Sequence, residues 1–160
     1  MDVYDYAMQM EKDGEKLYRE AASRASHLGV GAIMTMLADA EVAHYNLFKG
    51  MKEQKRGSLP AADLLKDVKN VFVKMKEKGG LEPAGLSEID VYRKAQDIEK
   101  QSEDFYRDAA AKSDEAARGS FVEVADEEKK HYFILQQIIE FVSRPQQWLE
   151  NAEWYHLDEY

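Results

Sequence analysis

The sequence contains no cysteine, and this absence removes several kinds of chemistry at once. Disulfides, thiolate catalysis, iron–sulfur clusters and cysteine-ligated zinc all need that side chain. Any metal ion in this protein must therefore be held by glutamate, aspartate, histidine or tyrosine.

Basic charge and long apolar runs are also scarce. The chain has 22 Lys and Arg against 31 Asp and Glu, a net charge of −9, whereas nucleic-acid binding needs clustered basic side chains. No apolar run approaches the roughly 20 residues that a membrane span requires. The N-terminal sequence MDVYDYAMQMEKDGEK is acidic and polar, unlike a secretory signal. We expect no nucleic acid and no membrane as partner, and a cytoplasmic location.

Proline and glycine are few, which favours long helices. The chain has 3 prolines and 9 glycines. Helical apolar periodicity runs over four stretches, residues 2–26, 30–54, 87–112 and 115–143. Short turns, the first at 27–31, make each consecutive pair an antiparallel hairpin. A crossover at about 56–86 joins the hairpins, and its apolar spacing predicts a short helix.

The sequence thus predicts an all-α protein built as a four-helix bundle. The bundle domain is expected at 1–145, with repeat halves at about 2–55 and 87–143. An aromatic C-terminal tail follows at 146–160, and we expect it to pack on the bundle or on a partner subunit.

The two hairpins are copies of one another. The sequence MEKDGEKLYREAA from Met10 matches IEKQSEDFYRDAA from Ile98, at an offset of 88 residues. The sequence ADAEVAHYNLF from Ala38 matches ADEEKKHYFIL from Ala125, at an offset of 87 residues. Apolar residues recur in any bundle, but repeated polar ones need a further reason.

Each long stretch carries polar residues at core-facing positions, which recur in steps of three and four along a bundle helix. In chain order these polar residues are Glu11, Glu41, His44, Glu99, Glu128 and His131. Counted from the turns at about 1.5 Å per residue, they lie at similar heights in the bundle. Four carboxylates and two imidazoles are therefore expected to meet inside it.

Such a cluster is costly without a counterion. An unpaired buried carboxylate costs several kcal/mol, against a total stability of about 5–15 kcal/mol. Raised pKa values relieve part of that cost. Two divalent cations bring four positive charges against four carboxylates, and a Glu-x-x-His turn supplies an oxygen and a nitrogen ligand on one helix face. The pattern therefore predicts a site for two metal ions.

Several other residues repeat between the hairpins or resemble the motif, and most of them have two possible roles. A third Glu-x-x-His, Glu153/His156, has no partner and is read as a surface coincidence. Tyr18 and Tyr106 either pack in the core or hydrogen-bond the ligand carboxylates, and they are the candidate catalytic residues. The remaining repeated acids either line solvated helix faces or support the site from outside: Glu15, Glu103, Asp39 and Asp126.

The combined motif resembles the ferritin-like di-iron carboxylate proteins, in which two helices give a Glu each and two give a Glu-x-x-His. Within them it is most similar to the rubrerythrin group, over about residues 2–143. The resemblance implies a ferritin-like bundle and six iron ligands, the six polar residues above. It also implies that Glu41 and Glu128 each serve one iron beside the nearby His, while the other two glutamates bridge.

Two departures from the rubrerythrin pattern change the expected chemistry. The rubredoxin-like domain with its four cysteines is missing, so the built-in route for electrons is missing too. The extra glutamate three residues after the third-helix ligand is replaced by Ser102, with Glu103 one residue later. The six-ligand set is closer to a symmetric, bacterioferritin-like site.

We therefore expect a non-haem di-iron oxidoreductase that oxidises Fe(II) and reduces O2 or hydrogen peroxide, in oxidative-stress defence or iron handling. An external electron donor such as a rubredoxin-like protein, and a homodimer, are expected with it. Two alternatives stay open at this point. One is an iron-buffering protein without turnover, and the other is a structural bundle that holds manganese or zinc.

Overall fold

The computed structural model describes residues 2–55, 57–150 and 152–159, with side chains in the last stretch from residue 156 onward. Positions 1, 56, 151 and 160 of the expected domain ranges lie outside the described residues. The helices are α1 (Val3–Arg24), α2 (Leu28–Lys52), α3 (Leu64–Lys78), α4 (Leu86–Lys112), α5 (Glu115–Ser143) and α6 (Pro145–Glu150), followed by the 3₁₀ helix η1 (Ala152–Glu159). Among the described residues there is no strand, and no helix is long and apolar enough to cross a membrane.

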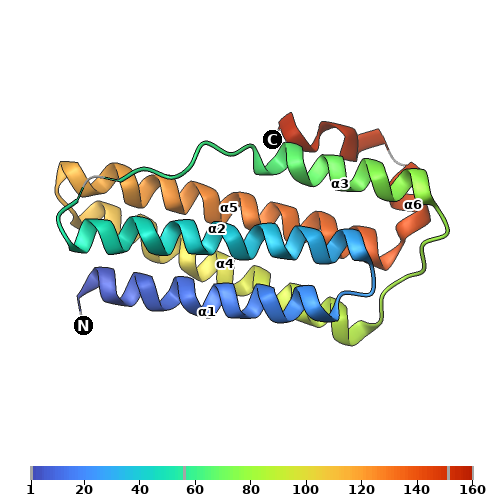
Figure 1. The fold of residues 1–160 in the computed structure, drawn as a ribbon, viewed down its shortest axis with the longest axis horizontal. Coiled ribbons are helices and arrows are strands. Elements are labelled where there is room, and N and C mark those ends of the chain that lie inside the picture. The colour runs from blue at the N-terminus through green and yellow to red at the C-terminus, as the bar shows by residue number, and fades with distance from the viewer. Residues whose placement is uncertain (1, 56, 151, 160) are drawn as a thin grey trace.

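Four long helices, α1, α2, α4 and α5, form the predicted bundle, with α1 beside α2 and α4 beside α5 (Figure 1). The second hairpin turns in two residues because Asp114 caps α5, its side chain accepting a hydrogen bond from Ala117 N. The extended segment after α2 and the helix α3 together carry the chain back along the bundle. The all-α, ferritin-like fold class is confirmed.

The first turn lies earlier than predicted, at residues 25–27, so that α2 includes Gly29 and Gly31. Both glycines lie inside α2, where they let neighbouring segments pack closely, and neither forms a turn. A Cβ on Gly29 would lie 2.4 Å from Met75 Sδ of α3, and one on Gly31 would lie 3.2 Å from the carbonyl oxygen of Ala22. The predicted turn at 27–31 is therefore wrong. Its glycines suggested a turn, but they serve helix packing instead.

The tail packs on the bundle through α6. Trp148 is buried, with its ring centroid 4.4 Å from that of Phe72 in α3 and 5.7 Å from that of Phe141 in α5. Leu157 of η1 is buried in the same apolar cluster. The side chains of Trp154 and Tyr155, part of the expected aromatic tail, lie outside the described residues.

Truncation of Trp148 tests this anchoring. Trp148→Ala is expected to lower the free energy of unfolding by about 3–5 kcal/mol, because it opens a cavity between α3 and α5. Chemical denaturation measures the loss, and Leu28→Ala is the control. Leu28 is 87% exposed, so its truncation changes stability by no more than about 0.5 kcal/mol. Equal effects of the two variants would contradict the packing.

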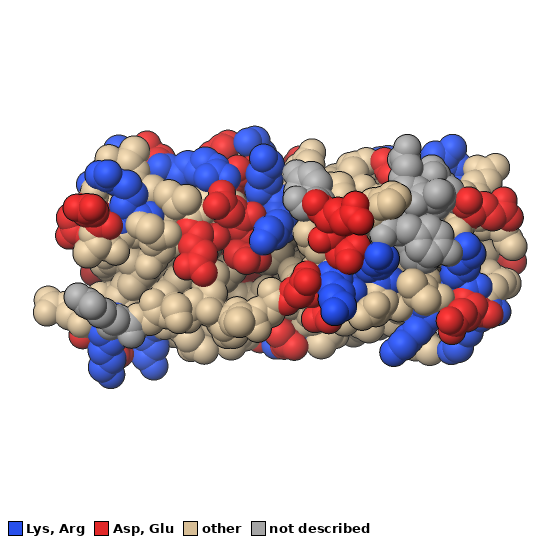
Figure 2. Space-filling view, turned by 90° about the horizontal axis from the view of Figure 1, so that it is seen from above, with Lys and Arg blue, Asp and Glu red and all other residues tan. Residues whose placement is uncertain are grey.

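The core is divided into two apolar clusters that lie toward opposite ends of the bundle. One gathers around Ile33, Phe72 and Phe141, and the other around Phe48, Tyr106 and Phe121. The six polar residues predicted from the sequence lie between them. Acidic and basic side chains are interspersed over the face that carries the crossover (Figure 2).

Candidate metal centre

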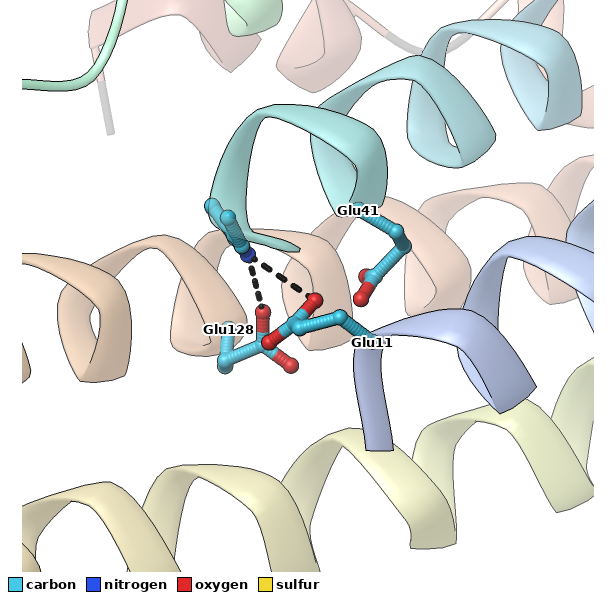
Figure 3. A group of neighbouring side chains, drawn as sticks. Glu11, Glu41 and Glu128 are labelled. Carbon is cyan, nitrogen blue, oxygen red and sulfur yellow. Dashed lines mark ion pairs between the residues drawn. The ribbon is translucent and has the colours of Figure 1, made fainter. Parts of the chain in front are cut away.

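All four bundle helices contribute to one buried polar cluster. It consists of Glu11 from α1, Glu41 and His44 from α2, Glu99 from α4, and Glu128 and His131 from α5. Each of these residues is at most 3% exposed. Figure 3 shows the carboxylates of Glu11, Glu41 and Glu128 pointing toward one another from three helices. The structure therefore brings together every metal ligand predicted from the sequence.

The donor atoms form two groups of four, and the atoms within each group lie within 4.8 Å of one another. The Glu11/His44 group is completed by Glu41 and Glu128, and the Glu99/His131 group is completed by the same two residues. Glu41 and Glu128 thus belong to both groups. This grouping differs from the roles implied by the family resemblance, because the carboxylates common to both groups come from the Glu-x-x-His turns.

Both imidazoles turn Nδ1 toward the carboxylates. His44 Nδ1 lies 3.0 Å from Glu128 Oε1 and 3.3 Å from Glu11 Oε2. His131 Nδ1 lies 3.3 Å from oxygens of both Glu41 and Glu99. The two rings are stacked, with centroids 5.7 Å apart and planes 9° from parallel. The cluster therefore presents one nitrogen to each group of oxygens.

Burial and mutual repulsion act unequally on the four carboxylates. Burial, followed by the charges of neighbouring glutamates, raises the pKa of Glu41 and of Glu128 well above the usual value. Burial also acts on Glu99, but the charge of His131 and several hydrogen bonds outweigh it and lower the pKa to about 2. Glu11 is likewise buried, and His44 in turn lowers its pKa. In the metal-free protein, burial and repulsion therefore favour the protonated form of the two shared carboxyls.

The ion-pair contacts of His44 lack the geometry of hydrogen bonds, and several buried polar atoms of the cluster therefore make no hydrogen bond. They are Glu11 Oε2, Glu41 Oε1, Glu99 Oε2, Glu128 Oε1, His44 Nδ1 and His131 Nε2. A buried polar atom without a partner costs about 1–3 kcal/mol, so native proteins contain few of them. Oxygen and imidazole nitrogen donors suit iron, manganese and zinc. The donor set fits two divalent metal ions, which would give the carboxylate oxygens and His44 Nδ1 their missing partner.

Gly14 leaves room for one shared carboxylate. A Cβ on Gly14 would lie 3.0 Å from Glu41 Oε2 and 3.2 Å from Glu41 Cδ. Any side chain at this position of α1 would therefore press on Glu41. The matching position in the second repeat is Ser102, which is also small and buried.

Substitution of Gly14 separates site geometry from helix stability. Gly14→Ala is expected to weaken metal binding, because the carboxylate of Glu41 must move by a few tenths of an ångström. Calorimetric metal titration measures this loss. The control is Gly119→Ala in α5, where an added Cβ meets nothing within 4 Å. That control gains up to about 1 kcal/mol of helix propensity and should bind metal as the parent does. Unchanged binding by Gly14→Ala would contradict the tight fit.

Tyr18 and Tyr106 connect the two repeats crosswise. The Tyr18 hydroxyl donates to Glu99, and the Tyr106 hydroxyl donates to Glu11 over 2.6 Å. Both rings are also packed in the core. Burial, and then the nearby carboxylates, raise the pKa of both phenols well above 10. Each tyrosine therefore remains a hydrogen-bond donor that orients the carboxylate of the other repeat.

The remaining repeated acids lie outside the cluster. Arg19 bonds Glu15 and Asp39, and Arg107 bonds Glu103 and Asp126, with matching 3.0 Å contacts to the two aspartates. The two aspartates therefore pair with arginines at the helix surface and do not orient the imidazoles. Glu103 turns to Arg107 and belongs to neither group of donors. The sequence interpretation did not single out these two arginines, although they recur at the offset of 88 residues.

The described part of the third Glu-x-x-His motif, Glu153/His156, lies apart from the metal cluster. His156 is exposed and lies 3.2 Å from Glu159, while the side chain of Glu153 lies outside the described residues. His156 takes no part in either group of donors.

One protein family matches most of the chain. Residues 2–139 match the family model described as Rubrerythrin. No curated protein and no solved structure gave a match. The matched segment includes all four bundle helices up to Ile139 and all six clustered side chains. The chain therefore belongs to the rubrerythrin family.

Proposed function

We propose that this protein binds two iron ions in the buried cluster and uses them to oxidise Fe(II) and reduce O2 or hydrogen peroxide. The observation that carries this proposal is the pair of four-donor groups that share Glu41 and Glu128. Glu11 and His44 would complete one iron site, and Glu99 and His131 would complete the other. Two divalent ions would balance the four carboxylate charges.

The donor types suit iron in both oxidation states. Carboxylates favour the harder Fe(III), and imidazole retains Fe(II). When bound, the iron pair supplies two electrons to one oxidant molecule. The shared carboxylates Glu41 and Glu128 hold both sites together, while Tyr18 and Tyr106 fix the carboxylates of Glu99 and Glu11. The apolar clusters on either side keep bulk water away from the donors.

This activity fits a role in oxidative-stress defence or iron handling. Because the chain has no cysteine for a redox centre of its own, electrons for repeated turnover would come from a separate one-electron donor, such as a rubredoxin-like protein. We further propose that the protein works as a homodimer, which light scattering would test.

Reaction of the reduced protein with peroxide tests the proposal. Protein loaded anaerobically with Fe(II) should react rapidly with hydrogen peroxide and gain the near-ultraviolet absorption of carboxylate-bound Fe(III). The matched control is zinc-loaded protein, which has the same donors and no redox chemistry. An iron-loaded protein whose spectrum does not change on addition of peroxide would refute the oxidoreductase and favour iron buffering.

A further inference from the structure

A row of aromatic rings connects the surface to the cluster in one half of the molecule. Tyr6 of α1 is 50% exposed, and its ring centroid lies 4.9 Å from that of Phe105 in α4. The ring of Phe105 meets that of Tyr106 edge-on at 5.4 Å. The Tyr106 hydroxyl then donates to Glu11. Contacting rings thus run without a break from solvent to a carboxylate of the Glu11/His44 group.

The other repeat has no such row, although it builds the same half-site. The residues that correspond to Tyr6 and Phe105, at the offset of 88, are Lys94 and Leu17. Tyr18, the counterpart of Tyr106, contacts no aromatic ring within the part of the chain that the structure describes. The fold and the carboxylate geometry therefore do not require the row.

Core packing alone does not explain the outer end of the row. Aromatic side chains stabilise a core by being buried, whereas Tyr6 is half exposed. One turn away on the same face of α1, Val3 is 37% exposed. The row therefore joins two exposed apolar side chains at the surface to a carboxylate of the metal cluster.

We propose that reducing electrons enter the metal centre through Tyr6, Phe105 and Tyr106. This inference rests on the proposed function and adds the place where the donor acts. Electron tunnelling weakens steeply with the distance crossed without intervening bonded or contacting groups, and ring contacts shorten that distance. Each molecule of a one-electron donor protein is oxidised by one electron and reduces one Fe(III) to Fe(II). Two donor molecules therefore return the iron pair to its reduced state, and no proton needs to move along the rings.

The absence of cysteine makes a direct test possible. The variant Gln9→Cys places a single cysteine at an exposed position one turn from Tyr6, and this cysteine carries a photoactive ruthenium label. The matched control places the label at Asp97, the exposed counterpart of Gln9 in the other repeat. A laser flash with a sacrificial reductant makes the label a one-electron donor. The loss of Fe(III) absorption then gives the rate of electron transfer.

Electron transfer from position 9 is expected to be several-fold faster than from position 97. Phe105→Leu, which copies Leu17 of the other repeat, should slow transfer from position 9 and leave transfer from position 97 unchanged. Tyr6→Lys should act in the same way. Equal rates from the two labels, or a rate from position 9 that is insensitive to Phe105→Leu, would overturn the proposal.

A second measurement needs no iron and so separates this inference from the proposed function. In metal-free protein with Tyr6→Phe and Tyr45→Phe, which keep the two rings nearest the label but remove their phenols, a photo-oxidised label at position 9 withdraws one electron from Tyr106. The phenolic proton passes to Glu11 along their hydrogen bond. Electron paramagnetic resonance should detect a tyrosyl radical that is absent with Tyr106→Phe and reduced with Phe105→Leu. A radical yield that Phe105→Leu leaves unchanged would refute the ring row even if iron is bound.

Discussion

Replacement of Glu41 by glutamine is expected to abolish tight binding of both metal ions. Glu41 belongs to both groups of donors, so its loss removes an oxygen ligand from each site. Groups that only support a ligand change metal affinity by about 10–100-fold, and loss of a shared ligand should exceed that range. Glu128→Gln should behave in the same way. Anaerobic Fe(II) titration, followed by calorimetry, measures the number of ions bound and their affinity.

The effect of Glu11→Gln distinguishes shared from unshared ligands. Glu11 belongs to one group alone, so this variant should weaken one ion strongly and leave the other bound. Glu15→Gln is the control, because Glu15 pairs with Arg19 outside the cluster. This variant should still bind two ions. If Glu41→Gln and Glu11→Gln lost the same single ion, the shared role of Glu41 would be wrong.

The stability of the metal-free protein should fall as pH rises, whereas that of the metal-loaded protein should not. Glu41 and Glu128 have raised pKa values when folded, so the folded chain retains protons that the unfolded chain releases above its pKa of about 4.3. Each retained proton costs about 1.4 kcal/mol of stability per pH unit in that window. Glu99, with a pKa of about 2, loses its contribution only below the window.

Metal ions change the sign of this dependence because bound carboxylates hold no protons. Metal affinity should therefore weaken as pH falls below the raised pKa values. Thermal melting of both forms from about pH 5 to about pH 7 tests the prediction, and the two trends should diverge. The Glu41→Gln Glu128→Gln double variant is the control, since it lacks both carboxyls and should lose the slope below about pH 6. Above that pH, His44, whose pKa is also raised in the folded chain, adds a slope of the same sign. A metal-free protein that becomes more stable as pH rises would contradict the assignment of protons to these residues.

Much of the cluster could be predicted because the repeat marks it. Polar residues at core-facing positions, copied at a fixed offset, indicated that Glu11, Glu41 and their partners converge. The repeat could not show which carboxylates are shared, since that depends on how four helices rotate against one another. Nor could it show that Tyr106 reaches across to Glu11, because the crosswise bond joins residues 95 apart.

The errors in the fold have a related cause. Gly29 favours a turn when read locally, but its missing side chain makes room for Met75 of α3. The ion pairs around Arg19 and Arg107 also depend on the distance between neighbouring helices, which the spacing of residues along one helix does not give. In both cases contacts between helices decide the outcome, and a single sequence carries little record of them.

The most direct test of the metal centre is a crystal structure of iron-loaded protein with anomalous scattering measured at the iron absorption edge. Two strong anomalous peaks are predicted in each chain, one in the Glu11/His44 group and one in the Glu99/His131 group. Oxygens of Glu41 and Glu128 should contact both peaks. A single peak in the cluster, or iron bound only at surface carboxylates, would contradict the two-metal site.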